Sequence, residues 1–192
     1  MNKTLLWAAM AIAMLANLAN ASVWSIDSEK TAVEFKVKNM KVFTVGGIFK
    51  SVTGEVVVDE KDTAKSTVSA EIDAKTVNTG NEKRDEHLRT GDFLDVANHN
   101  KMKFVSKRIV KDKNRLKIHG DLTIRGKTKG VVLDAGEEAA IEKALKDATH
   151  CKITGTTEIN RIDFGVDNSK FLSSGISDNV NITLNIELVK KH

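Results

Sequence analysis

Apolar and polar residues alternate along most of the chain after residue 22, a pattern typical of β-strands that are buried on one face. The clearest run is RLKIHGDLTIRG at 115–126, where the apolar side chains stand at the even positions. Charged and polar residues take the other parity, so this run predicts a long antiparallel strand with one buried face. Gly120 stands on that face and leaves a gap, because it has no side chain where the pattern requires an apolar one.

The same alternation predicts the other strands of the domain. It recurs at 23–26, 32–38, 48–59, 67–73, 101–110, 127–134, 151–160 and 179–190. Gly46-Gly47 predicts a turn or bulge before the third of these runs. About eight strands joined mostly by short turns predict an all-β fold. A closed antiparallel barrel is favoured, because closure leaves no exposed strand edge.

Two segments depart from alternation and predict short helices. Residues 81–90 are polar apart from Leu88 and lack alternation, and Gly91 fits the end of a helix there. Between 136 and 147, alanine, isoleucine and leucine recur at helical spacing against glutamate and lysine. The predicted fold is therefore a closed antiparallel barrel of about eight strands with one or two short helical segments.

The first residues have the pattern of a secretory signal peptide. Lys3 precedes an apolar run at 5–18, and Ala19-Asn20-Ala21 has the form of a cleavage site. The apolar run is shorter than the roughly 20 residues that span a bilayer. We therefore expect residues 1–21 to be removed, and residues 22–192 to form a single domain in the periplasm. No later segment is apolar enough to predict a membrane span.

Composition narrows the classes of partner and chemistry. The 30 basic and 26 acidic residues give a formal charge of +4, and tyrosine is absent. This weak, dispersed charge does not predict nucleic-acid binding, which needs clustered basic groups and stacking aromatics. The single cysteine, Cys151, cannot form an internal disulfide, and we interpret it as a small strand residue. The histidines lack the spacing of metal ligands, so neither a metal nor another cofactor is expected.

Four glycines fall on the expected buried parity of four different strands: Gly54, Gly120, Gly130 and Gly155. One interpretation is that they line an elongated apolar cavity. The other is that they let the strands bend while aromatic rings fill the gaps, the candidates being Phe35, Phe93, Phe104 and Phe164. A cavity would suit an alkyl or isoprenoid chain, because about fifteen buried methylene groups give a gross term of about 12 kcal/mol.

Six motifs occur in order along the chain and carry a resemblance to a known family. They are Trp24 with Ile26-Asp27; Val33-Glu34-Phe35; Gly47-Ile48-Phe49 followed by Gly54; Arg84-Asp85-Glu86-His87-Leu88 with Asp92-Phe93; GDLTIRG at 120–126; and NRIDFG at 160–165. This ordered set resembles the YceI-like family of exported lipocalin-fold proteins. The resemblance implies an eight-stranded barrel whose pore binds a polyisoprenoid or a related long-chain amphiphile without catalysis.

The chain departs from the family pattern at two places. The family usually has a proline where this chain has Asn98-His99-Asn100-Lys101. It commonly has a short glycine-containing segment where residues 136–147 look helical here. A helix capping one end of the barrel would change how a ligand reaches the pore.

The inward parities supply the candidate pore-lining residues. They are Val33, Phe35, Val37, Phe49, Gly54, Val56, Phe93, Phe104, Ile118, Gly120, Leu122, Gly155, Phe164, Ile182 and Leu184. Arg84, His87 and Arg89 are candidates to hold a polar head group at the pore mouth. The alternative is that Arg84, Asp85 and Asp92 fix this connection to the barrel through ion pairs and caps. No catalytic residue is assigned.

The function predicted from these observations is a periplasmic binding or carrier protein for a polyisoprenoid or other long-chain lipid. Two alternatives stay open: an enzyme acting on such a lipid in the same pocket, with His87 as acid or base, and an interaction module with a filled core. The expected partner is the lipid, with no nucleic acid. Transient contact with a membrane surface and a homodimer are left open.

Overall fold

The computed structural model describes residues 21–39, 43–146, 148–166 and 175–191. Residues 1–20, which hold most of the predicted signal peptide, lie outside these ranges. The strands are β1 (Ala21–Ile26), β2 (Ala32–Asn39), β3 (Phe43–Phe49), β4 (Val52–Asp59), β5 (Thr67–Asp73), β6 (Lys101–Asp112), β7 (Arg115–Ile124), β8 (Lys127–Glu137), β9 (His150–Asn160) and β10 (Ile176–Lys190). The helices are α2 (Glu82–Arg89) and α3 (Glu138–Leu145), with 3-10 turns η2 (Thr63–Lys65), η3 (Ala74–Thr76) and η4 (Arg161–Phe164).

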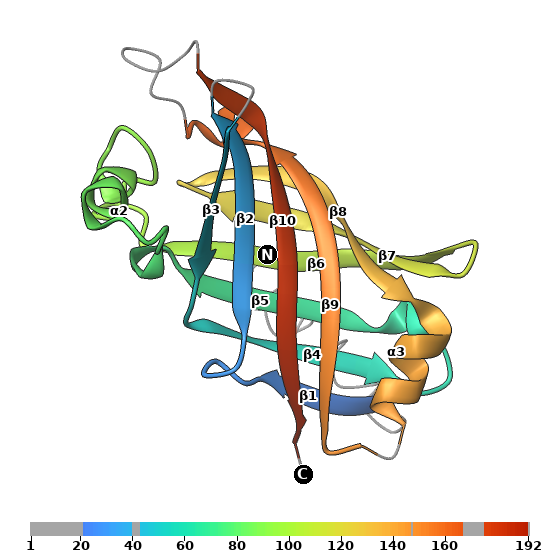
Figure 1. Cartoon of the computed structure of the whole chain (residues 1–192). Helices are drawn as coiled ribbons and strands as arrows, with labels where there is room; N and C mark the ends of the chain where they lie inside the picture. The colour runs from blue at the N-terminus through green and yellow to red at the C-terminus, as the bar shows by residue number, and fades with distance from the viewer. Residues whose placement is uncertain (1–20, 40–42, 147, 167–174, 192) are drawn as a thin grey trace, which may run out of the picture.

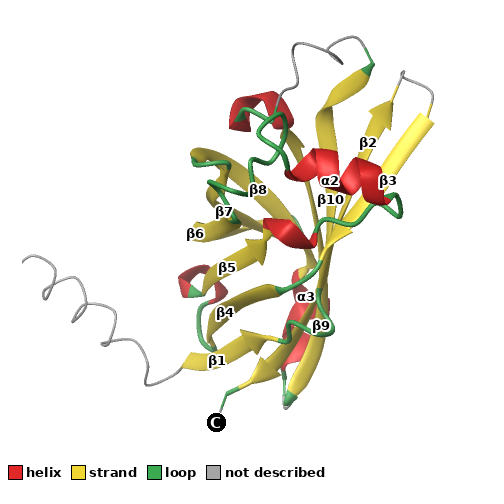
Figure 2. Ribbon diagram, turned by 90° about the vertical axis from the view of Figure 1, so that its left-hand side faces the viewer, coloured by secondary structure: helices red, strands yellow, loops and turns green. Residues whose placement is uncertain are grey.

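The strands form a closed antiparallel barrel, which confirms the predicted fold. Eight strands follow one another around the wall in the order β1-β4-β5-β6-β7-β8-β9-β10, and β10 pairs again with β1. The long β10 pairs with β1 only near its C-terminal end and with β2 along the rest of the same edge. Strand β2 in turn pairs with β3, so the β2–β3 hairpin continues the wall where β1 stops. In Figure 1, β2, β3, β9 and β10 stand upright in front of β4 to β7, which cross behind them. Helix α2 lies toward the upper end of the barrel and α3 toward the lower end (Figure 2).

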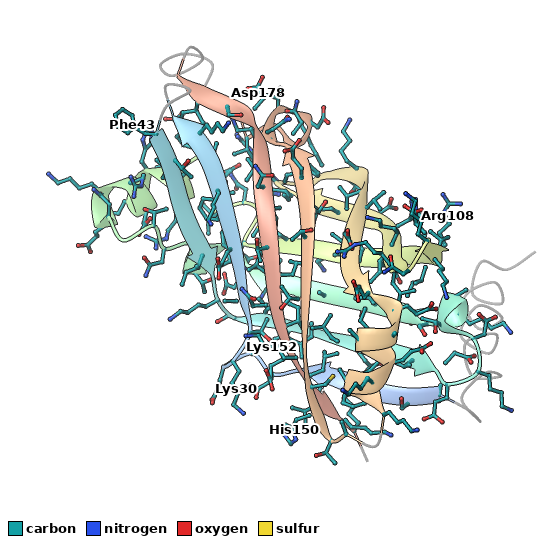
Figure 3. The ribbon with its side chains drawn as sticks, turned by 45° about the vertical axis from the view of Figure 1, so that its right-hand side comes forward. Lys30, Phe43, Arg108, His150, Lys152 and Asp178 are labelled. Atoms are coloured by element: carbon teal, nitrogen blue, oxygen red, sulfur yellow. The ribbon has the colours of Figure 1, made fainter. Side chains whose placement is uncertain are left out.

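Strand β7 has the predicted alternation. Leu116 and Ile124 are buried, whereas Arg115 is exposed on the opposite face. Such a strand buries one face because its neighbours β6 and β8 hydrogen-bond its edges and leave the two faces in different surroundings. Polar side chains on the outer parity face solvent, and Arg108 projects away from the barrel beside the β6–β7 hairpin (Figure 3).

Both predicted helices are present, with boundaries set by local chemistry. The Asn81 side chain caps α2 by accepting a hydrogen bond from the Arg84 N–H at 3.1 Å. The helix ends at Arg89 with Thr90 as its C-cap, one residue before the predicted glycine stop. Helix α3 begins at Glu138, because β8 continues through Gly136, whose positive φ of 102° suits glycine.

Three local predictions were wrong. The single strand expected over 48–59 is divided into β3 and β4, because Ser51 turns the chain with a φ of 55°. Gly46 and Gly47 lie inside β3 rather than in a turn, and Gly47 leaves room for the Phe35 ring against the strand. Gly130 is exposed on the outer face, since Leu133 and other odd-numbered residues of β8 face inward.

The buried residues form two clusters. The larger one includes Val52, Val77 and Phe164, each 1% exposed. The smaller one centres on Trp24 and Cys151, beside α3. Burial raises the pKa of the Cys151 thiol to about 11, so it is uncharged and a poor nucleophile at neutral pH.

A candidate ligand cavity in the barrel

An apolar cavity of about 500 Å³ runs through the interior of the barrel. This volume lies within the range of about 300–1,000 Å³ for small-molecule sites. Leu184 and the other apolar residues of β10 that face it extend from Ile176 to Leu188. At about 3.3 Å per residue, the inward positions from Val180 to Leu188 alone extend over roughly 26 Å, so the space suits an elongated guest. Its polar lining residues are few: Thr63, Ser66, Thr79, Arg84, His87, Thr157 and Arg161.

The structure places most of the predicted pore residues on this cavity. Thirteen of the fifteen are among its lining residues: Val33, Phe35, Val37, Phe49, Val56, Phe93, Phe104, Ile118, Leu122, Gly155, Phe164, Ile182 and Leu184. They come together because the inward faces of successive strands converge on one interior when the sheet closes. Their contact with a ligand stays a prediction.

Gly54 and Gly120 do not line the cavity, which corrects the predicted glycine wall. A Cβ at Gly120 would lie 2.5 Å from Cζ of Phe104 and 2.5 Å from the Val105 carbonyl oxygen. At Gly54 the space is taken by the backbone of β5, with the Ala70 Cα at 2.8 Å. Phe104 therefore fills the gap at Gly120, as the alternative interpretation expected, and the cavity lies beyond its ring.

Further lining residues escaped sequence reasoning for different reasons. Val180, Ile186 and Leu188 share the parity of Ile182, so the alternation of β10 could have found them. Ile109 could not be found that way, because a register shift between Ser106 and Arg108 reverses the parity of β6. Loop residues such as Leu94 and Val77 give no periodic signal at all.

Helix α3 closes part of the cavity with Ile141 and Leu145. A polar network outside the cavity lies where β8 leads into this helix. Asp134 accepts from Arg115 Nε at 2.9 Å and from Lys117 Nζ at 2.8 Å, and Lys111 pairs with Glu138. Hydrogen bonds from Arg115, and also from Lys117, hold the pKa of the Asp134 carboxyl well below its usual range.

The opposite end of the cavity carries its basic groups. Arg84 donates from Nε to the Thr79 hydroxyl at 2.8 Å and from Nη2 to the Thr79 carbonyl at 2.9 Å. The Asp85 carboxylate is buried and accepts from the Thr79 N–H at 2.9 Å. These hydrogen bonds join α2 to Thr79 in the strand connection before it, whereas the alternative expectation was that ion pairs and caps fix this connection to the barrel.

Only two of the three predicted head-group residues reach the cavity. Arg84 and His87 line it, whereas Arg89 donates to the carbonyls of Lys75 and Val77 and does not. His87 stands with Nε2 3.4 Å from an Asp92 carboxylate oxygen and with its ring edge-on to Phe93. Its side chain is 49% exposed, so it lies between the cavity and solvent.

Arg161 is a lining residue that was not among the predicted head-group candidates. It is 8% exposed, and its guanidinium donates to the carbonyls of Val166, Ile176 and Ser177. It also contacts the Asp178 carboxylate at 3.2 Å. These bonds tie the end of β9 to the beginning of β10, so the main effect of Arg161 is to hold the barrel end together.

The described ranges contain no group of three or more His, Cys, Asp or Glu side chains placed to hold a metal ion. In the same part of the chain, no helix is long and apolar enough to cross a membrane.

Comparisons with solved structures show the same fold in three bacterial proteins. BcnA of Burkholderia cenocepacia superposes with a TM-score of 0.73 at 22% identity, over 84% of this chain and 98% of BcnA. A YceI protein of Campylobacter jejuni gives a TM-score of 0.63 at 29% identity, over 81% and 90% of the two chains. A polyisoprenoid-binding domain from Saccharophagus degradans gives 0.65 at 15% identity, over 88% and 98%.

Sequence comparisons extend over nearly the whole chain. A UPF0312 protein of Vibrio parahaemolyticus is 31% identical over 195 residues, covering 100% of both proteins. Protein YceI of Escherichia coli O157:H7 is 37% identical over 138 residues, or 70% of this chain and 72% of that protein. The sequence pattern of the YceI-like domain matches residues 24–188. The chain therefore belongs to the YceI-like family.

Proposed function

We propose that this protein binds a polyisoprenoid or another long-chain amphiphile in the barrel cavity and carries it through the periplasm. The observation that carries the proposal is the continuous, almost wholly apolar cavity of about 500 Å³. The shared fold of the Saccharophagus degradans polyisoprenoid-binding domain is consistent with such a ligand.

The length of the cavity, roughly 26 Å along the inward positions of β10, supports a chain rather than a compact guest, and its volume sets how much of a chain fits. If a methylene group takes about the 30 Å³ that a water molecule occupies in the liquid, roughly 17 fit. Burial at about 0.8 kcal/mol each gives a gross term of about 14 kcal/mol. Immobilising and ordering the partners costs about 4–15 kcal/mol, so the net affinity lies well below that sum. Apolar burial is still the dominant favourable contribution.

The polar end of the ligand is placed at the α2 end of the cavity in this proposal. His87 supports the placement, because it lines the cavity and its side chain is 49% exposed. Arg84 contributes less, since two of its donors already bond Thr79. Such contacts fix the orientation of a ligand more than its affinity.

We propose binding without catalysis. The Thr79 hydroxyl, which stands on the cavity beside Arg84, donates to the Asp85 carboxylate at 2.5 Å. A threonine nucleophile needs an adjacent base that activates it toward the substrate. Here the carboxylate also accepts the Thr79 N–H and serves as a link within the protein. This arrangement favours a structural role for the pair.

The periplasmic location is proposed from the sequence of residues 1–21 alone. Fractionation of expressing cells should find the protein in the periplasmic extract, and sequencing of its amino terminus should begin at Ser22. A full-length protein that remains with the membrane or cytoplasm would contradict this part of the proposal.

The ligand proposal is tested by organic extraction of the purified protein followed by mass spectrometry, and by titration with the fluorescent fatty acid cis-parinaric acid. Ile182→Trp fills the cavity from β10, whereas Asn181→Trp adds the same ring at the neighbouring exposed position. If the indole displaces two methylene groups of the guest, the loss of about 1.6 kcal/mol weakens binding by roughly fifteenfold. Absence of any long-chain ligand, with no uptake of the probe by the parent protein, would refute the proposal.

A further inference from the structure

The wall of the barrel is interrupted between β8 and β9. Among the described residues these strands share one paired position, Asp134 with Thr156, whereas β9 and β10 share eleven. The strands approach at that point because Gly155 has no side chain: its Cβ would lie 3.1 Å from the Asp134 carbonyl oxygen. Helix α3, rather than a tight turn, connects the two strands, so no hairpin holds them in register.

A cleft of about 340 Å³ lies on the side of this pair away from α3. Residues 129–132 of β8 form one side, 157–160 of β9 form the other, and Asp163 and Phe164 of η4 contribute to the rest. Continued antiparallel pairing would join these segments by backbone bonds. Instead the Thr157 hydroxyl donates to the Val132 carbonyl at 2.9 Å, so a side chain makes the connection.

The cleft and the main cavity adjoin each other. They share Thr157, Ile159 and Phe164 as lining residues. Ile159 is 8% exposed and Phe164 is 1% exposed, so these two side chains stand between the outer cleft and the interior. Connecting the two spaces here requires these side chains to move, and among the described residues no backbone pairing joins 129–132 to 157–160. Opening the wall between β9 and β10 would instead break a ladder of backbone hydrogen bonds.

The surroundings of the cleft are amphipathic. Val132 is 44% exposed and Ile162 is 37% exposed, which places them among the four most exposed large hydrophobic side chains of the described residues. The rim also carries exposed charged groups of both signs, Lys129, Glu158 and Asp163. A guest with an apolar chain and a polar end would find both kinds of contact here.

We propose that the gap between β8 and β9 is a lateral entrance, through which the apolar chain of the ligand passes between Ile159 and Phe164 into the cavity. This inference rests on the proposed function. A lengthwise path at the α2 end would bring the chain past Arg84, His87 and Arg161, and at the other end past Ile141 and Leu145 of α3. The lateral path admits the apolar chain without leading it past Arg84 and His87, and the polar end of the ligand stays at the hydrated rim while the chain enters.

The test uses a cross-link between β8 and β9 to prevent the gap between them from widening. Gly130→Cys and Glu158→Cys place thiols on exposed positions of the two strands, and a short bismaleimide joins them. The matched control is the same variant with both thiols capped by N-ethylmaleimide. Cys151 is buried, so it stays unmodified. A second control joins β6 to β7 through Val105→Cys and Asp121→Cys, which are directly paired.

The readout is the stopped-flow rate of cis-parinaric acid uptake. Cross-linking β8 to β9 should lower the association and dissociation rates together by at least tenfold, with the equilibrium affinity within twofold of the capped control. The β6–β7 cross-link should leave both rates within twofold. Equal rates in the cross-linked and capped proteins, or a change in affinity with an unchanged association rate, would overturn the lateral entrance. Failure of the unmodified protein to bind the probe would instead refute the proposed function.

Discussion

Gly120 offers a sharp test of how the barrel wall is packed. Gly120→Ala adds one methyl group whose carbon would lie 2.5 Å from Cζ of Phe104 and 2.5 Å from the Val105 carbonyl oxygen. Ordinary carbon contacts lie at about 3.5–4.0 Å, so each neighbour must move by roughly 1 Å. The backbone at Gly120 is not in the left-handed region that favours glycine. The substitution therefore tests packing, with no contribution from backbone strain.

The two neighbours differ in how easily they can move. The Phe104 ring borders the cavity and can shift into it, but Val105 is paired with Asp121 across β6 and β7. Overpacking of a core typically costs about 1–3 kcal/mol, and the fixed carbonyl places Gly120→Ala in the upper part of that range. For a domain of this size, about 2–3 kcal/mol corresponds to a fall in Tm of roughly 4–12 °C.

Urea unfolding followed by the fluorescence of the buried Trp24 measures this loss of stability. Adding Phe104→Leu should restore only part of it, because the Val105 oxygen remains. At Gly47 the close neighbours are side chains, Phe35 and Thr79, so Phe35→Leu should rescue Gly47→Ala more fully.

The matched control for this series is Gly130→Ala. A Cβ at Gly130 meets no heavy atom within 4 Å, so we expect a change within about 0.5 kcal/mol. A Gly120→Ala protein as stable as the parent, or a Gly130→Ala protein equally destabilised, would refute the packing argument.

Three further predictions concern other parts of the structure. Asp134→Asn should lower Tm at neutral pH, because the variant loses the charged partner of Arg115 and Lys117. Bonds from these two residues depress the folded-state pKa of Asp134. The difference in Tm between parent and variant should therefore persist above about pH 4 and shrink as the pH falls below it. Asn81→Ala removes the side-chain cap of α2 and should cost about 0.5–2 kcal/mol in urea unfolding, and an unchanged midpoint would contradict that cap. Cys151 should react with a thiol reagent at neutral pH only after unfolding, because it is buried with a pKa of about 11; fast labelling of the native protein would show the opposite.

The sequence by itself determined most of the elements, and the buried face of those strands whose alternation is unbroken. Alternation in 115–126 and 179–190 has a period of two because successive strand side chains point to opposite faces. A strand with one buried face can therefore be recognised from residues that are adjacent in the sequence. The ordered motifs likewise indicated the family that the comparisons show. Local helical patterns were sufficient for α2 and α3 within a few residues.

Only the tertiary structure decided which inward side chains fill the interior of the barrel and where a cavity is left. Gly120 was a gap in the pattern of its own strand, but Phe104, sixteen positions earlier on the paired β6, occupies it. The partners of Arg84 and the interruption between β8 and β9 likewise depend on segments that the chain brings together only by folding. Alternation reports the surroundings of one strand at a time, whereas a cavity and its openings arise from volumes contributed by residues far apart in the sequence.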